Sequence, residues 1–378
     1  MFGKIISHSI KDNKVHFIFE RNIGRIEIIN PYIINVFSPL KYDNHYSKAV
    51  ENLKVEECSF QVEAKESFIE ITTEALIVKV YDNFKVDFYS KDGNVLCEDL
   101  REERDPFVRR GNVSIAEEEG HSVEKNSDNH KIEVIKKIFG DEKFYGLGDK
   151  TGHLNKRGYS YEMWNTDDPK PHVESYKALY KSIPFFITLR EESVFGIFFD
   201  NTFKSYFDMG KENSKYYYFG ADNGNLDYYF ISGNSVKHIL MGYTTLTGKT
   251  PLPQMWTLGY HQSRWSYSPE SRVKEIAKTF REKDLPCDVV HLDIDYMDNF
   301  KVFTWDKERF KDEKKTLQEL KDKGFKTVTI IDPGVKKEKG YEIYETGLKN
   351  NYFATDKDGL TYVNQVWPGD SVFPDFSN

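Results

Sequence analysis

The sequence predicts an all-β antiparallel sandwich followed by a parallel α/β segment. Residues 1–230 contain one short alternating segment after another, with turns between them. Near Gly233 the pattern changes, and strands begin to alternate with helices. These later strands are nearly continuous apolar runs, which is typical of a parallel sheet covered on both faces. We therefore expect a sandwich domain at residues 1–230 and a βαβαβ series within residues 231–378.

The antiparallel region is clearest in four segments. They are KVHFIFERN at residues 14–22, SFIEITT at 67–73, ALIVKVYD at 75–82 and FKVDFYSKDGNVL at 84–96. The last contains Asp92 and Gly93, a pair that favours the tight turn of a β-hairpin. Strands at this spacing, joined by short turns, indicate two sheets packed face to face.

The second region opens with a predicted helix in NSVKHILMGYTTLTGKTPLP, residues 234–253. Asn234 or Ser235 can cap its start, and Gly248 can end it. The apolar positions that we expect to face the protein interior are Val236, Ile239, Leu240 and Tyr243.

Three strands and two helices follow. The predicted strands are MWTLGYHQS at residues 255–263, which we expect to be buried, CDVVHLDIDY at 287–296 and KTVTIIDPG at 326–334. The first helix lies in residues 268–286, with Ser268 as its cap and Pro269 at its first position. Its expected buried face is Val273, Ile276, Ala277 and Phe280. The second helix lies in residues 312–325 and ends at Gly324.

Composition excludes several classes of partner. The length of 378 residues predicts two domains, and 53 Lys and Arg against 61 Asp and Glu give a net charge of −8 that is spread along the chain. Such a surface attracts neither nucleic acid nor an anionic membrane. The N-terminus lacks the apolar core of a signal peptide, and no apolar run is long enough to cross a bilayer. Because Cys58, Cys97 and Cys287 are widely spaced and odd in number, we expect free thiols and a cytoplasmic protein.

All three predicted parallel strands become polar at their carboxyl ends. The first ends in residues 261–265, HQSRW, the second in 293–295, DID, and the third in 332–334, DPG. In parallel α/β folds, ligand sites gather at this edge because the loops there vary while the strands hold them in place. A single aspartate at a strand end more often caps a turn. Three polar strand ends together favour one functional site.

A metal site is the competing interpretation of HLDID, residues 291–295. His291 and Asp293 are two positions apart, so on a strand they would face the same side and could share an ion in a two-metal hydrolase. The sequence has no second pair at similar spacing, so we expect His291 to be packed inside the fold and the site to hold no metal. DNGNLD at residues 222–227 and YGLGDKTG at 145–152 lack the spacing of a calcium loop and a phosphate cradle, so no cofactor is expected.

Four segments then carry a specific resemblance. They are FYGLGDKTGHLNKRGYSYEMWNTD at residues 144–167, LGYHQSRWSY at 258–267, HLDIDYMDNFKVFTWD at 291–306 and VWPGDSVFPDF at 366–376. In this order they resemble glycoside hydrolase family 31, the α-glucosidases and α-xylosidases. The resemblance implies a galactose-mutarotase-like β-sandwich, followed here by the first three β/α units of a (β/α)8 TIM barrel. It also implies retaining hydrolysis of terminal non-reducing α-linked glucose through two carboxylates.

The resemblance assigns sugar contacts to the ends of the second and third barrel strands. Asp293 matches the carboxylate that hydrogen-bonds hydroxyls of the non-reducing sugar, and Ile294 lines the same pocket. Asp332, after the third strand, matches a residue that supports this group. Carboxylates suit the task because they accept charge-assisted hydrogen bonds from neighbouring hydroxyls.

Aromatic and loop residues complete the implied substrate-binding set. Trp265 matches the aromatic residue beside the first strand, and Trp367 matches the aromatic wall of the pocket. Asp167, in MWNTDDP, matches the sandwich loop that meets the substrate beyond the cleaved bond. The implied partner is an oligosaccharide with α-linked glucose, bound without a cofactor.

One family motif does not occur in the sequence. The nucleophile of the family lies in a W-x-D-M-N-E motif on the fourth barrel strand, and the 378 residues contain no such string. We therefore expect no catalytic residue in this chain. The nucleophile and the acid/base are expected beyond Asn378, so the chain would be the N-terminal part of an α-glucosidase, inactive alone, from a shortened chain or an interrupted gene.

Two further expectations follow. An incomplete barrel exposes a sheet edge, which the sandwich, a second copy of the chain or the rest of the barrel would have to cover. A different class of function is also open, since a sandwich with an aromatic-rich half-site suits a non-catalytic carbohydrate-binding or assembly protein. Saturable sugar binding without hydrolysis would favour that class.

Overall fold

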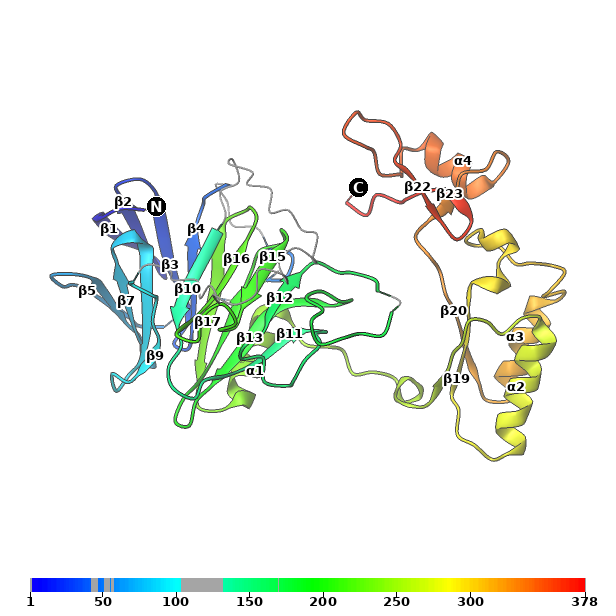
Figure 1. The fold of residues 1–378 in the computed structure, drawn as a ribbon, viewed down its shortest axis with the longest axis horizontal. Helices are drawn as coiled ribbons and strands as arrows, with labels where there is room; N and C mark the ends of the chain where they lie inside the picture. Colours follow the sequence, from blue (N-terminus) through cyan, green and yellow to red (C-terminus); the bar gives the residue numbers. More distant parts are fainter. Residues whose placement is uncertain are drawn as a thin grey trace, which may run out of the picture. The chain divides into compact units, whose positions relative to one another are not determined.

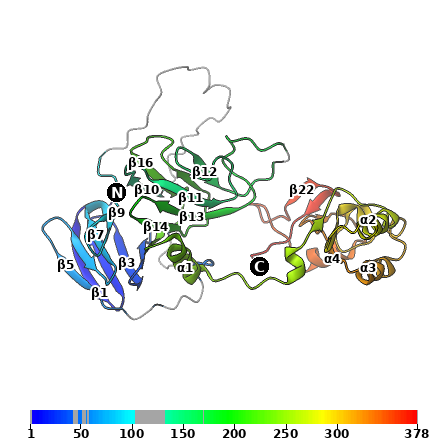
Figure 2. The ribbon, with the colours of Figure 1, turned by 90° about the horizontal axis from the view of Figure 1, so that it is seen from below.

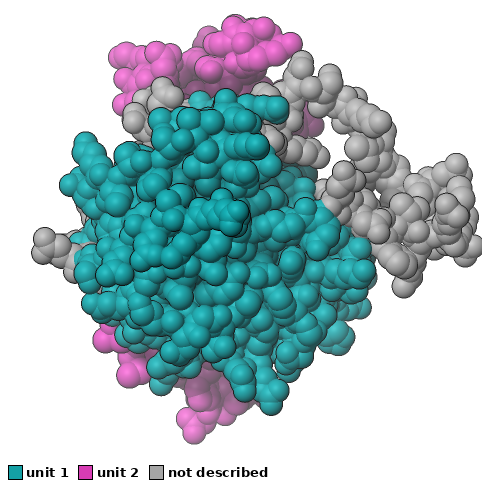
Figure 3. Space-filling view, turned by 90° about the vertical axis from the view of Figure 1, so that its left-hand side faces the viewer, with its two compact units in different colours: residues 1–249 teal, residues 250–378 magenta. Residues whose placement is uncertain are grey.

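The computed structural model describes residues 2–41, 47–50, 55, 58–102, 132–168 and 170–377. The chain forms two compact units, Met1–Lys249 and Thr250–Asn378, which are coloured separately in Figure 3. None of the described helices has the length and apolar content that a membrane span requires.

The described part of the first unit consists of antiparallel sheets (Figure 1). The largest sheet has eight strands in the order β1-β2-β3-β4-β17-β14-β13-β11. Its strands are β1 (Ile5–Lys11), β2 (Lys14–Phe19), β3 (Ile23–Asn30), β4 (Ile33–Ser38), β11 (Lys143–Gly148), β13 (Ser182–Leu189), β14 (Val194–Phe199) and β17 (Leu226–Gly233).

Two smaller sheets accompany the eight-stranded sheet. The five-stranded sheet follows chain order, with β5 (Gln61–Ala64), β6 (Ile69–Thr72), β7 (Leu76–Tyr81), β8 (Lys85–Ser90) and β9 (Val95–Cys97). The short 3-10 turn η1 (Asp82–Phe84) joins β7 to β8. The four-stranded sheet, in the order β10-β16-β15-β12, contains β10 (Ile132–Lys137), β12 (Ser160–Met163), β15 (Ser205–Asp208) and β16 (Tyr216–Ala221).

The main core lies between the eight-stranded sheet and the two smaller sheets. Phe88 of β8 stacks on Phe230 of β17, with ring centroids 3.9 Å apart. Phe186 of β13 meets Phe207 of β15 edge to face, with centroids 6.1 Å apart. Because these contacts join strands of different sheets, they define the predicted sandwich, which is confirmed.

The other face of the eight-stranded sheet is covered by α1 (Val236–Thr247) (Figure 2). The ring of Tyr243 stacks on Phe185 of β13, with centroids 4.0 Å apart. Gly242 permits this close approach, since a Cβ there would lie 2.6 Å from a methyl of Ile231. Apolar contacts on both faces explain why β14 and β17 are buried almost throughout.

The packing of α1 determines where the two units divide. The predicted caps are observed, because Ser235 accepts a hydrogen bond from the backbone N–H of His238 and Gly248 ends the helix with φ of 83°. The sequence placed the domain boundary at residue 230. Since α1 packs against β14 and β17, the structural division falls instead between Lys249 and Thr250.

The second unit contains a three-stranded parallel sheet with helices beside it (Figure 1). The strands are β18 (His261–Gln262), β19 (Val289–Leu292) and β20 (Lys326–Thr329), and they pair in that order. The helices are α2 (Glu270–Glu282), α3 (Glu313–Asp322) and α4 (Glu342–Lys349). A small antiparallel sheet adds β21 (Val335–Lys336), β22 (Val363–Val366) and β23 (Gly369–Val372). Short 3-10 turns are η2 (Met255–Leu258), η3 (Ile294–Tyr296) and η4 (Asp298–Phe300).

The predicted buried face of α2 is correct, whereas on α1 the prediction is wrong for Val236 and Leu240, which are 41% and 44% exposed. Val273 and Ala277 of α2 are fully buried, and Ile276 and Phe280 pack partly against the same core. The cap of α3 is Asp312, whose carboxylate accepts a hydrogen bond from the N–H of Lys315 at 2.9 Å. The second unit therefore has its own core, built from α2, α3 and β19.

Two local predictions in this unit are wrong. Residues 255–258 form the turn η2 instead of a buried strand, with Met255 84% and Leu258 70% exposed. Apolar composition alone cannot distinguish a strand from a turn when no neighbouring strand pairs with it. The cap of α2 is Pro269, and its side chain makes no capping bond. Ser268 is not needed there, because the N–H of Glu270 donates to the carbonyl of Arg309 at 3.0 Å.

Candidate functional site

The end of β19 is shaped by a tight turn. The strand stops at Leu292, and Asp293 caps the 3-10 turn η3 by accepting a hydrogen bond from the N–H of Ile294 at 2.7 Å. Ile294 is buried. The hydroxyl of Tyr296 donates to the carbonyl of Ile330, at 2.9 Å, just beyond β20. The turn is therefore tied to both strands, which holds Asp293 at the edge of the sheet.

Asp332 lies beyond the end of β20 at the same edge. Partial burial raises the pKa of the Asp332 carboxyl, and the nearby charge of Asp293 raises it further. Within the part of the chain that the structure describes, no lysine or arginine forms an ion pair with either residue. Two carboxylates thus share one edge without a cation to balance them.

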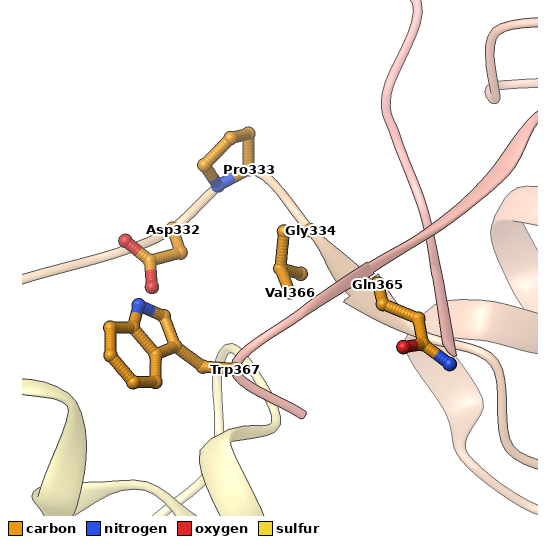
Figure 4. A pocket seen from close by; sticks show the side chains of 6 residues that line it. All are labelled: Asp332, Pro333, Gly334, Gln365, Val366 and Trp367. Atoms are coloured by element: carbon orange, nitrogen blue, oxygen red, sulfur yellow. The ribbon is translucent and has the colours of Figure 1, made fainter. Parts of the chain in front are cut away.

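A cavity of about 490 Å³ adjoins Asp332. It is lined by Asp332, Pro333, Gly334, Gln365, Val366 and Trp367. Figure 4 shows the Asp332 carboxylate directed toward the indole of Trp367. The volume lies within the range of small-molecule sites, and the lining combines an aromatic wall with a few polar groups, as such sites generally do.

Two exposed tryptophans meet at this cavity, which Trp367 helps to line. The ring centroids of Trp265 and Trp367 are 5.5 Å apart, and their planes are tilted by 49°. Trp265 is 63% exposed and Trp367 is 58% exposed. Large rings left open to solvent next to a cavity are unusual for a core and suit contact with a ligand. The structure thus brings Trp265, Asp332 and Trp367 into one region of the second unit.

Asp167, the remaining predicted contact, belongs to the first unit. It follows β12, and its carboxylate accepts a hydrogen bond from the hydroxyl of Tyr180 at 2.9 Å. The same hydroxyl donates to the carbonyl of Asp168 at 3.2 Å. Trp164, three residues before Asp167 in the chain, is 57% exposed. The other five predicted residues all belong to the second unit.

His291 contacts another histidine. Its Nε2 lies 3.1 Å from Nδ1 of His261 on the neighbouring strand. Burial lowers the pKa of His291, and the proximity of His261 lowers it further. In the described ranges, no group of three or more His, Cys, Asp or Glu side chains is placed to hold a metal ion. The pair links β18 to β19.

Sequence reasoning placed Asp295 in a polar strand end without giving it a role, and it missed Arg309 altogether. Trp265 donates from its indole Nε1 to Oδ2 of Asp295 at 3.1 Å, and Arg309 lies 3.2 Å from the other oxygen of that carboxylate. The strand alternation in HLDID did not reveal this, because β19 ends at Leu292 and the following residues turn. An acid two residues beyond Asp293 and an Arg three residues beyond the same family segment were the available signals.

Comparison with known proteins identifies the family. The "Glycosyl hydrolase 31 N-terminal galactose mutarotase-like domain" matches residues 23–208. The "Glycosyl hydrolases family 31 TIM-barrel domain" matches residues 250–378. The chain belongs to glycoside hydrolase family 31. The predicted family and its order of domains, a sandwich followed by the start of the barrel, are confirmed.

Two relatives of this chain bear the name α-glucosidase. Alpha-glucosidase 2 of Bacillus thermoamyloliquefaciens is 50% identical over 235 residues, which are 62% of this chain and 30% of the relative. An alpha-glucosidase of Saccharolobus solfataricus is 34% identical over 247 residues, 65% of this chain and 35% of the relative. The chain therefore spans about a third of the length of these two relatives.

A solved family 31 structure superposes on the whole chain. It is the Flavobacterium johnsoniae GH31 dextranase complexed with glucose, which is 31% identical with a TM-score of 0.85. The match covers 100% of this chain and 45% of the dextranase.

Proposed function

We propose that this chain provides the sugar-binding part of a retaining α-glucosidase that acts on terminal non-reducing α-linked glucose. One observation carries the proposal: Asp293 and Asp332 share a strand-end edge where no described residue supplies a balancing cation, and two exposed indoles, Trp265 and Trp367, lie in the same region. Membership of family 31 and the α-glucosidase relatives support the substrate class.

The chemistry of the edge suits a sugar ring. A pyranose presents several hydroxyl donors, and carboxylates accept such hydrogen bonds with the strength that a charge adds. Burial is the larger cause of the raised pKa of Asp332, and repulsion from the Asp293 carboxylate raises it further. A ring whose hydroxyls donate to both carboxylates would relieve that repulsion. The indoles would cover the apolar face of the ring and exclude water from the hydrogen bonds.

The proposal assigns no nucleophile to these residues. Retaining hydrolysis needs a nucleophile and an acid/base about 5 to 5.5 Å apart, and the family motif that carries the nucleophile does not occur in the 378 residues. We infer that the chain binds the sugar but does not cleave it by itself. Asp167 is proposed as a further substrate contact, in line with the family motif.

Hydrolysis of p-nitrophenyl α-glucoside tests this division of roles. We expect the 378-residue chain to release no p-nitrophenol above the uncatalysed rate. Under the same conditions, the Bacillus thermoamyloliquefaciens enzyme serves as the positive control. Steady turnover by the chain would contradict the inference that its carboxylates only bind.

A non-catalytic carbohydrate-binding protein is the second candidate. The open indole pair favours it, because such a surface can bind sugar without further groups. A dedicated binder would bind disaccharides saturably. It would not prefer sugars that end in a non-reducing α-linked glucose. The proposed partner is in both cases an oligosaccharide with α-linked glucose, and a cytoplasmic location is proposed from the free thiols.

A further inference from the structure

The Trp265 side chain is largely open to solvent. It is 63% exposed in the part of the chain that the structure describes, so packing covers less than half of it. It meets Trp367 at a tilt of 49°. Its indole Nε1 donates a hydrogen bond to Oδ2 of Asp295 at 3.1 Å. An exposed ring needs such a directional contact to keep one orientation, because its rotamers otherwise interconvert freely.

Asp295 is itself held in place by Arg309. The guanidinium Nη1 lies 3.2 Å from Oδ1 of Asp295, while Nε lies 2.7 Å from a carboxylate oxygen of Asp306. A third guanidinium nitrogen donates to the carbonyl of Met297 at 3.4 Å. Arg309 thus contacts three groups at once, which leaves the Asp295 carboxylate little freedom to turn away from the indole.

The base of this chain of contacts is rigid. Phe310, next to Arg309, is fully buried and packs against Trp305 with ring centroids 5.6 Å apart. The carbonyl of Arg309 accepts the N–H of Glu270 at the start of α2. The contacts therefore connect the helix start and a buried cluster to an exposed indole.

We propose that Asp295 is a positioning residue for sugar binding: held by Arg309, it fixes the plane of Trp265 and hence the surface on which the sugar ring stacks. The inference rests on the proposed function, which gives Trp265 its sugar. Asp295 then does not hydrogen-bond the sugar, in contrast to Asp293. We assign the two aspartates different roles because both carboxylate oxygens of Asp295 already accept hydrogen bonds, one from Trp265 and one from Arg309.

The test compares two substitutions of one residue in the 378-residue chain. Asp295→Leu removes the acceptor while keeping a side chain branched at Cγ, and Asp295→Asn keeps an oxygen that can accept from the indole. Asp298→Asn is the matched control, because Asp298 lies in the same segment but pairs with Lys301 at 2.8 Å. Nitrogen-15 labelling of the indoles, assigned with Trp265→Phe, reports the hydrogen bond, and calorimetry with isomaltose reports binding.

The expected results separate positioning from a merely structural role. In Asp295→Leu, the Trp265 indole N–H should move upfield and exchange faster with water, and isomaltose affinity should fall about tenfold; in Asp295→Asn, affinity should stay within about twofold. The control should match the unsubstituted chain in both measurements. Thermal unfolding, followed in parallel, should show that all variants remain folded.

Two results would overturn the proposal. One is an unchanged Trp265 resonance in Asp295→Leu, and the other is full isomaltose affinity in a variant whose resonance has moved. Failure of the unsubstituted chain to bind isomaltose would count against the proposed function. The resonance alone would then decide whether Asp295 positions the indole.

Discussion

Acidic side chains have opposite surroundings in the two units. In the sandwich, Lys136 is completely buried, and its Nζ lies 3.0 Å from Asp99 and 2.9 Å from the carbonyl of Val86. At the barrel edge, Asp293 and Asp332 lie near each other, and no described residue balances their charge. The Asp99 carboxylate of the sandwich is thus paired with a buried lysine, whereas the carboxylates of Asp293 and Asp332 have no such partner among the described residues.

This difference separates structural from functional charge. A buried charge that is fully paired contributes to a unique packing and leaves nothing for a ligand. Two like charges at an edge disfavour the folded state slightly, and such a cost is typical of binding sites. The contrast predicts that substitutions in the sandwich change stability, whereas substitutions at the edge change binding.

The largest effect is expected when the buried pair is broken. Burial alone would lower the pKa of Lys136, but the Asp99 carboxylate holds it above its usual range, so the amine is charged. Lys136→Met leaves Asp99 buried without its cation and should cost about 3 to 5 kcal/mol of unfolding free energy. Urea denaturation followed by tryptophan fluorescence and circular dichroism measures this loss.

The neighbouring lysine provides a matched control. Lys137 is part-exposed and lies 3.4 Å from Glu98, so Lys137→Met should cost less than about 1 kcal/mol. Equal losses of unfolding free energy in Lys136→Met and Lys137→Met would show that the buried ion pair stabilises the fold no more than the part-exposed one.

Glu142 offers the next largest effect, through pH. Burial raises the pKa of Glu142 to about 7, although Arg190 lies 3.6 Å away and opposes the shift. An acid whose folded pKa is raised stabilises the fold below its unfolded pKa and loses that contribution as pH rises toward the folded pKa. Glu142→Gln should therefore gain on the order of 2 kcal/mol over the unsubstituted chain between pH 5 and pH 8.

Thermal unfolding across this pH range measures the gain. Glu191→Gln, at an exposed position beside Arg190, is the control and should change the free energy of unfolding by less than about 0.5 kcal/mol. A gain in Glu142→Gln that does not change between pH 5 and pH 8 would mean that burial does not hold this carboxyl in its neutral form.

The smallest expected effect is at the edge. Because burial and Asp293 raise the pKa of Asp332, ionisation of Asp332 disfavours the folded state above its unfolded pKa. After allowance for solvent screening, Asp332→Asn should stabilise the chain by about 0.5 kcal/mol at pH 7, and the gain should vanish toward pH 4. Differential scanning calorimetry at both pH values measures this gain. If Asp332→Asn were less stable than the unsubstituted chain at pH 7, the claim that the two carboxylates repel each other would be contradicted.

The order of elements could be predicted from sequence, because periodicity reports which face of a segment is buried. Alternation gave the strands of the sandwich, and the cap Ser235 gave the start of a helix. The strand predicted at residues 255–263 forms only at His261–Gln262, and residues 255–258 form a turn, because apolar composition does not show whether a partner strand exists.

The site was predicted less completely. The polar strand ends singled out Trp265, Asp293 and Asp332, the family resemblance added Trp367, and the structure shows the surroundings of these residues. The contacts of Asp295 with Trp265 and Arg309 could not be read from sequence. They depend on a turn after β19 and on a residue 14 positions away, which only the folded chain brings together.

Calorimetric titration with isomaltose, of the unsubstituted 378-residue chain beside Asp293→Asn, decides whether the open edge binds sugar. Saturable heat is expected from the unsubstituted chain, with at least about tenfold weaker affinity in Asp293→Asn, since a charged acceptor is lost. Both proteins should unfold within about 3 °C of each other, with Asp293→Asn the slightly more stable one because it removes the repulsion with Asp332. Equal affinity in the two proteins, or no binding by the unsubstituted chain, would show that these carboxylates are not sugar ligands.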